Sequence, residues 1–237
     1  MEIGLTIAAF VTAGFVNGFL GFGAGILAMA FMTLSHDVLH AAGLVNVAGL
    51  FATTVMAWML RKHICWREVR AMLPTGLLGV FVGVYLLGSI DGEAMTRVLG
   101  ATVILIALVY LFKSTPPRIH GRGWGASAGF VGGMLQGAMN VGGPPVVAYV
   151  YGRPDPPDVA KATTQCIFLA FGTARALSAY SQGMLTEAIA WDFLAAAPAS
   201  VVGLVVGMRL SQRLSPERFR RVAWVAFGLL GACLMLT

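Results

Sequence analysis

Two glycine-rich breaks in otherwise apolar runs are the segments of this chain best suited to bind a ligand. They span residues 21–25 (Gly-Phe-Gly-Ala-Gly) and 137–145 (Gly-Ala-Met-Asn-Val-Gly-Gly-Pro-Pro). Glycine lets a ligand approach the backbone closely, and proline suits the first turn of a new helix. The free N–H groups and the positive dipole end at such a helix start favour an anion. The breaks therefore predict an anion site that is built largely from backbone.

Neutral polar side chains near the breaks could add hydrogen-bond donors. Asn17, Gln136 and Asn140 flank the breaks, while Asn46 and Gln165 occupy matching positions on the helices that follow them. The last two could face the same cavity or form hydrogen bonds between helices, and both interpretations stay open. The predicted substrate site consists of Asn17, Gly21, Gly23, Gly25, Asn46, Gln136, Asn140, Gly142, Gly143, Pro144, Gln165 and Arg175.

Arg175 is a charge within the apolar run 160–181, and a charge at that depth needs a partner. The predicted spans hold no Asp or Glu to pair with it, so a backbone carbonyl, water or an anionic ligand would do so. Ligand contact and a purely structural role are both open. The same lack of carboxylates argues against carboxylate-based cation coupling and favours passage of a small anion. His36, His40, His63 and His120 fall at span ends or in loops and are expected to be solvated.

The glycines also have a structural interpretation, because small residues at four-residue spacing let membrane helices pack closely. Three groups have this spacing: Gly14 with Gly18, Gly125 with Gly129 and Gly133, and Gly203 with Gly207. We interpret the last pair as a packing contact. We interpret the two breaks as binding elements, because glycine density, proline and matching position in both halves coincide there.

The elements that must position these residues are membrane helices. The 237 residues are 58% hydrophobic and 11% charged, with a mean hydropathy of +0.81. Apolar runs at 69–87, 94–112, 188–210 and 219–236 approach or exceed the ~20 residues that cross a bilayer as a helix. The N-terminus lacks the basic stretch and cleavage site of a signal peptide, so we expect the first run to remain in the mature protein. A polytopic membrane protein is predicted, and its net charge of +6 reflects basic loops rather than nucleic-acid binding.

The chain contains an internal duplication. Five residues of the first half recur 124 positions later: Pro74, Gly79, Gly83, Glu93 and Arg97 match Pro198, Gly203, Gly207, Glu217 and Arg221. Upstream, residues 14–18 match 129–133 at an offset of 115, and we place the difference of nine around 140–157. The polar stretch 114–123 is a linker between a first repeat (1–113) and a second repeat (124–237).

Charge distribution decides between two topologies for these repeats. If each glycine-rich element crosses the membrane, the repeats are parallel and Lys and Arg are divided almost evenly between the faces. If each is a hairpin that returns to its own side, all basic residues except Arg97 and Arg175, Lys161 included, fall on one face, which should be cytoplasmic. We therefore expect an all-α polytopic membrane protein of two inverted repeats, with both termini periplasmic. Each repeat would hold a re-entrant hairpin (5–34 in the first) and three transmembrane helices (38–60, 69–87 and 94–112).

Residues 14–25 (Gly-Phe-Val-Asn-Gly-Phe-Leu-Gly-Phe-Gly-Ala-Gly) and 133–149 resemble the paired glycine-rich motifs of the sulfite exporter TauE/SafE family. The Gly-Gly-Pro-Pro stretch at 142–145 is the most specific part, whereas Phe22 and Ala24 interrupt the family's usual run of adjacent glycines. The resemblance implies a bacterial inner-membrane permease for sulfite, sulfoacetate or another organosulfur anion. It also implies seven or eight predicted spans, a count that differs from six crossings plus two hairpins.

The resulting expectation is a secondary permease for a small anion, either sulfite or an organosulfonate, that works by alternating access. The alternatives are a passive anion channel and a membrane subunit without transport activity. An intramembrane enzyme is disfavoured, since the sequence has no His-Glu-x-x-His motif and no paired intramembrane aspartates. The three cysteines are far apart, so no disulfide, metal or cofactor is predicted. The expected partners are the anion and the bilayer, with a homo-oligomer possible through the Gly-x-x-x-Gly faces.

Overall fold

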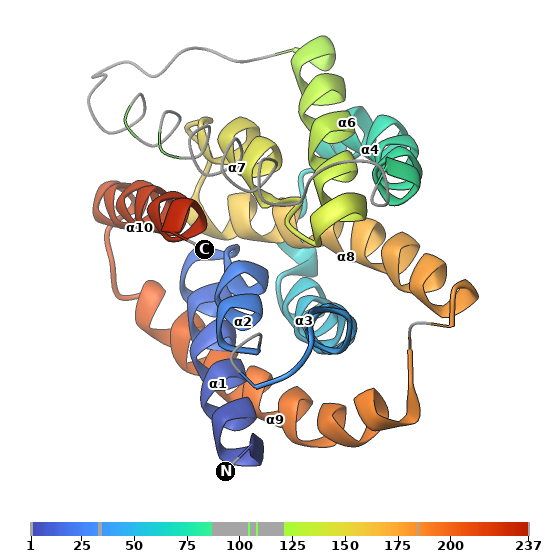
Figure 1. The fold of residues 1–237 in the computed structure, drawn as a ribbon. Coiled ribbons are helices and arrows are strands. Elements are labelled where there is room, and N and C mark those ends of the chain that lie inside the picture. The colour runs from blue at the N-terminus through green and yellow to red at the C-terminus, as the bar shows by residue number, and fades with distance from the viewer. Residues whose placement is uncertain are drawn as a thin grey trace.

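Helices account for all the regular structure in the residues that the computed structural model describes, which are 2–32, 35–86, 104, 108, 121–183 and 185–236 (Figure 1). The first half contains α1 (Glu2–Leu20), α2 (Ala24–Met32), α3 (Val38–Met59), the short 3-10 helix η1 (Arg61–His63) and α4 (Trp66–Leu86). The second contains α6 (Arg122–Met139), α7 (Gly143–Tyr151), α8 (Pro157–Ser181), α9 (Glu187–Ser211) and α10 (Pro216–Leu236). Most of the predicted helix 94–112 lies outside the described residues.

Four of the described helices are long and apolar enough to cross a membrane. They contain the segments Ile3–Leu20, His40–Met59, Trp66–Tyr85 and Glu187–Ser211. Long apolar helices without any strand in the described ranges confirm the predicted all-helical polytopic membrane protein.

Each glycine-rich element is broken into a long and a short helix at the predicted break. Gly21 and Gly23 adopt positive φ angles of 86° and 89° between α1 and α2, and Asn140 has a φ of 59° after α6. α7 then begins at Gly143 with proline in its first turn, as the sequence predicts. The nine-residue helices α2 and α7 each extend only about 14 Å, which is half the thickness of a hydrocarbon core.

The two breaks divide the chain into a first hairpin, α1 with α2, and a second hairpin, α6 with α7. Close backbone contacts join the long helix of each hairpin to a long helix of the other half. Gly14 and Gly18 of α1 lie against the Ser200 and Leu204 carbonyl groups of α9, and the two helices run parallel. From the α9 side, Gly203 packs against the α1 backbone in the same way. The predicted packing role of the Gly203-x-x-x-Gly207 spacing is thus confirmed, and the partner of α9 is α1.

The equivalent contact in the other half is between α6 and α4, which lie side by side in Figure 1. Gly133 and Gly137 of α6 lie against the carbonyl groups of Gly76 and Val80 in α4. The contacts between α1 and α9 and those between α6 and α4 therefore follow the same pattern, with the halves exchanged.

These contacts give a different register for the predicted duplication. Gly18 meets Leu204 and Gly137 meets Val80, so α1 and α6 correspond at an offset of 119 while α9 and α4 correspond at 124. The predicted offset of 115 is wrong by one helical turn, because glycines spaced four apart match almost as well after a slip of four. The corrected register pairs Asn17 with Gln136 and Gly21 with Asn140, and it is the same offset that relates Asn46 to Gln165.

α3 and α8 meet at the centre of the molecule and run antiparallel. The Leu50 side chain lies over Gly172, whereas further along the chain Cys65 donates its N–H to Thr163 Oγ1 at 3.0 Å. Residue numbers rise along α3 in the direction in which they fall along α8. The two helices therefore approach the hairpins of the opposite halves at opposite ends of this pair.

Two carboxylates lie inside helices that the sequence was expected to leave free of acids. Glu68 occupies the first turn of α4 with only 3% of its surface exposed, and Asp192 lies in the second turn of α9. Glu68 immediately precedes the predicted run 69–87, whereas Asp192 lies inside the predicted run 188–210, so the expectation that the spans contain no acid is wrong there. Both acids have basic partners in the fold, which accounts for their tolerance in apolar helices.

Candidate functional site

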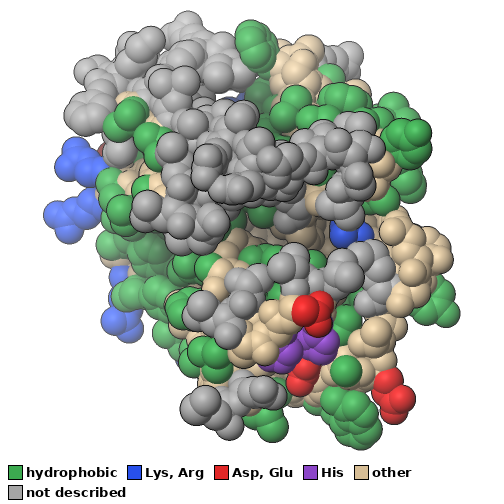
Figure 2. Space-filling view, viewed as in Figure 1, with side chains coloured by type: hydrophobic (Ala, Val, Ile, Leu, Met, Phe, Trp, Pro, Cys, Tyr) green, Lys and Arg blue, Asp and Glu red, His purple; other side chains and the backbone are tan. Residues whose placement is uncertain are grey.

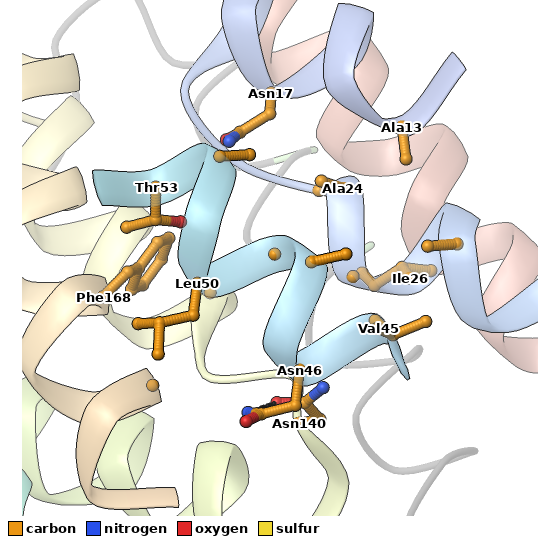
Figure 3. A pocket seen from close by; sticks show the side chains of 18 of the residues that line it. Ala13, Asn17, Ala24, Ile26, Val45, Asn46, Leu50, Thr53, Asn140 and Phe168 are labelled. Carbon is orange, nitrogen blue, oxygen red and sulfur yellow. Dashed lines mark hydrogen bonds between the residues drawn. The ribbon is translucent and has the colours of Figure 1, made fainter. Parts of the chain in front are cut away.

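A cavity of about 120 Å³ lies where the two breaks meet α3 and α8 (Figure 3). Figure 3 shows Asn17 and Ala24 of the first hairpin, Asn46 and Thr53 of α3, and Asn140 of the second hairpin around it. Of the twelve predicted site residues, eight line this cavity, and the four that do not are Gly21, Pro144, Gln165 and Arg175. Among the described residues, no Asp or Glu contributes to its lining. The volume suits a small ion rather than a large organic ligand.

The N-termini of both short helices face the cavity. Gly23, Ala24 and Gly25 contribute from the start of α2, and Gly142 and Gly143 from the start of α7. The N–H groups in the first turn of a helix have no acceptor within that helix, and the helix dipole adds partial positive charge there. The two N-termini therefore contribute partial positive charge to the cavity wall, which no charged side chain of the described residues lines.

A network of amides fixes the tip of the second hairpin. Asn140 Oδ1 accepts hydrogen bonds from Asn46 Nδ2 at 3.0 Å and from Gln136 Nε2 at 2.8 Å. Gln136 Oε1 in turn accepts from the Gly142 N–H at 2.9 Å. The left-handed conformation of Asn140 is therefore stabilised by α3, a helix of the other half.

The first hairpin is fixed in the corresponding way from α8. Gln165 is completely buried, and its Nε2 donates to Asn17 Oδ1 and to the Gly21 carbonyl, both at 2.9 Å. Asn46 and Gln165 thus each reach across to the break of the opposite half. The hydrogen bonds of Asn17 and Asn140 involve their amide oxygens. Their amide nitrogens donate to no described residue and so remain available at the cavity wall.

Arg175 lies next to the cavity without lining it. Its residue surface is 6% exposed, and neither Nε nor Nη1 has a hydrogen-bond partner among the described residues. Phe168 and Gly172 line the cavity, and Arg175 follows three residues later on the same face of α8. The backbone of Arg175 is therefore about one helical turn beyond the cavity along α8, and two of its guanidinium nitrogens have no partner among the described residues.

Lys161 is a buried cation that the sequence placed in a cytoplasmic loop, and the structure corrects this. It lies in α8 with 2% of its surface exposed, and its Nζ donates to the Gly18 carbonyl at 3.0 Å and to Ser211 Oγ at 2.5 Å. Tyr151 donates its hydroxyl to the Leu20 carbonyl close by. These two side chains cap carbonyl groups at the C-terminal end of α1 and so hold the first hairpin in place.

One pattern associated with catalysis occurs in the chain but does not form a nucleophile elbow. Residues 125–129 read Gly-Ala-Ser-Ala-Gly, which fits the Gly-x-Ser-x-Gly pattern of a nucleophile elbow. Such an elbow needs a strand, a sharp turn and then a helix, whereas this segment lies within α6. Ser127 Oγ donates to the Gly123 carbonyl at 3.1 Å on the exposed face of that helix. The serine therefore has the geometry of an ordinary helical residue.

Comparisons with known proteins agree with a transport role. A probable sulfite/organosulfonate exporter TauE of Cupriavidus necator is 31% identical over 91% of this chain and 87% of its own length. A probable inner membrane transporter protein TsaS of Comamonas testosteroni is 25% identical over 79% of this chain and 80% of its own length. No solved structure matches the chain.

The match to a family covers almost the entire sequence, including both hairpins and the helices between them. Residues 5–234 fit the description of the sulfite exporter TauE/SafE family. Because this match, the two relatives and the apolar helices all agree, the chain belongs to the TauE/SafE sulfite exporter family of membrane transporters.

Proposed function

We propose that the protein is a secondary permease that carries a small sulfur-containing anion, sulfite or an organosulfonate, through the cavity between its hairpins. The observation that carries this proposal is the convergence of the α2 and α7 N-termini on one small cavity whose described lining has no carboxylate. Two helix dipoles and the spare amide donors of Asn17 and Asn140 favour an anion, and this arrangement needs no bound cation to hold it.

Alternating access between two inverted repeats accounts for the arrangement of the helices. An axis that relates two antiparallel helices lies across their length, so the antiparallel α3 and α8 pair supports repeats of opposite orientation in the bilayer. Asn46 and Gln165 then tie each hairpin to the opposite repeat. Movement of one repeat against the other would open the cavity first to one side and then to the other.

The surface charges support an orientation with the basic loops in the cytoplasm and both termini in the periplasm. Figure 2 shows most of the visible Lys and Arg side chains along the left edge, with acidic and histidine side chains at the lower right. The exposed basic residues include Arg61, Lys62, Arg67, Arg70, Arg209, Arg213, Arg218 and Arg221. Short loops rich in Lys and Arg stay on the cytoplasmic side of bacterial inner membranes.

Uptake of radiolabelled sulfite into proteoliposomes tests the proposal, with empty liposomes as the control and unlabelled sulfonates, sulfate and acetate as competitors. We expect saturable flux that sulfite or a sulfonate blocks and acetate does not. Flux that rises linearly with concentration would indicate a passive anion channel instead. No flux above the control from folded protein would contradict the proposed substrate class.

Arg175→Ala is expected to lower this flux at least tenfold while leaving the folded protein intact. Arg175 follows the cavity-lining Gly172 by about one turn of α8, and two of its donors are unused by the described residues, so we expect a permeating anion to be its partner. Arg175→Lys, which keeps the charge, should retain more flux. Arg209→Ala, at an exposed position on α9, is the matched control. Wild-type flux from folded Arg175→Ala protein would remove Arg175 from the transport path.

A further inference from the structure

Three potential metal ligands meet at the end of the molecule where α3 begins. His40 Nε2 lies 2.8 Å from Asp192 Oδ2, and His36 Nε2 lies 3.7 Å from the same oxygen. These three atoms all lie within 4.8 Å of one another. The two histidine side chains are only 14% and 15% exposed, so the expectation that they are solvated is wrong. They are brought together with Asp192 by the packing of α3 against α9.

The two imidazole rings are oriented so that the same nitrogen of each faces Asp192. The rings stack with their centroids 4.7 Å apart and an angle of 14° between their planes. Ser35 Oγ lies 2.8 Å from His36 Nδ1, which leaves Nε2 of that ring for a ligand. Asp37 Oδ1 accepts the backbone N–H of His40 at 2.9 Å and fixes the first turn of α3. A partner on the second ring nitrogen, such as Ser35 on His36, is typical of a metal-binding histidine.

The equivalent position in the other half has a permanent cation. Asp192 corresponds to Glu68 at the 124-residue offset that relates α9 to α4. Arg153, from the connection between α7 and α8, places Nη1 3.0 Å from Glu68 Oε1, and Tyr149 donates its hydroxyl to Oε2 at 2.7 Å. In the first half, His36 in the connection between α2 and α3 and His40 in the first turn of α3 supply imidazoles in place of a guanidinium. An imidazole, unlike a guanidinium, does not carry a permanent positive charge.

We propose that a divalent transition-metal ion of the zinc type binds His36 Nε2, His40 Nε2 and Asp192 Oδ2. Two imidazoles and one carboxylate form a common zinc ligand set, with a fourth position left for water. Ligands about 2.0–2.2 Å from a tetrahedral ion are roughly 3.4 Å from each other, and the two separations from Asp192 Oδ2 lie on either side of that value. The ion would supply the charge that Arg153 supplies in the other half, and it would join α3 to α9.

Metal binding to the purified full-length protein, stripped of metal and freed of any affinity tag, tests this site. Cobalt(II) is added first, because a tetrahedral site gives it visible absorption bands, and zinc(II) is then titrated against it. We expect one ion per chain, displacement of cobalt by zinc, and a higher melting temperature with zinc. His40→Gln and Asp192→Asn should each weaken binding at least tenfold.

His63→Gln is the matched control, because His63 is an exposed histidine on η1 and is far from Asp192 in the sequence. It should bind zinc as tightly as the wild type does. Equal affinity in the wild type and in folded His40→Gln protein would overturn the proposal, as would loss of binding in His63→Gln. Failure of the wild type to bind either ion, with a melting temperature that rises only on acidification, would also overturn it. That outcome would indicate an ion pair between Asp192 and protonated histidine.

Discussion

Gly133→Ala is expected to leave little folded protein, because the added methyl group would overlap backbone atoms. A Cβ at this position would collide with the carbonyl group and Cα of Gly76 in α4. Neither helix can move aside without separating the whole α4–α6 contact, so the cost should exceed about 3 kcal/mol, the upper end of ordinary overpacking. For a chain of this size that corresponds to a fall in melting temperature of roughly 10 °C or more. Size-exclusion chromatography of detergent-solubilised protein after heating measures it.

Gly123→Ala on the same helix is the control for this prediction. A Cβ at Gly123 would meet no heavy atom of the described residues within 4 Å, so mainly helix propensity changes there, and alanine is favoured over glycine by about 1 kcal/mol. Gly18→Ala should behave like Gly133→Ala, since its methyl group would overlap the Leu204 backbone. Equal stability of the Gly133 and Gly123 variants would show that the α4–α6 contact is looser than the structure indicates.

These glycines show which parts of the fold can be predicted from sequence. Small residues at four-residue spacing indicate close helix contacts, because the spacing follows from the geometry of one helix. The identity of the partner does not follow from it, and neither does the register between repeats. A slip of one turn changes few identities in such a sequence, so only the contact of Gly137 with Val80 and of Gly18 with Leu204 gives the correct offset.

The breaks that form the cavity could be predicted because their chemistry is local. Glycine and proline determine where a helix ends and the next begins, whichever helices surround them. Buried charges could not be placed in this way. Lys161, Glu68 and Asp192 sit near helix starts, where sequence alone suggests a solvated loop. The burial of Lys161 and Glu68, and the partial burial of Asp192, depend on carbonyl groups and basic side chains that are distant in sequence.

The largest effect on transport is expected from Asn140→Asp, which should lower anion flux at least a hundredfold in folded protein. Asn140 Oδ1 accepts hydrogen bonds from Asn46 and Gln136, and an aspartate oxygen can accept both. The amide nitrogen that is lost donates to no described residue. The substitution therefore preserves the hairpin tip and adds a negative charge at the cavity wall.

A negative charge at Asn140 is unfavourable for the proposed substrate because two like charges 4 Å apart repel by about 4 kcal/mol at an effective dielectric constant of 20. It would also cancel the positive potential at the α2 and α7 N-termini, on which anion binding depends. Gln212→Glu, an exposed change of the same kind after α9, adds equal charge away from the cavity and should leave sulfite uptake unchanged. If the Asn140→Asp and Gln212→Glu proteins both keep wild-type uptake, the anion does not pass the hairpin tips, and the cavity is not its route.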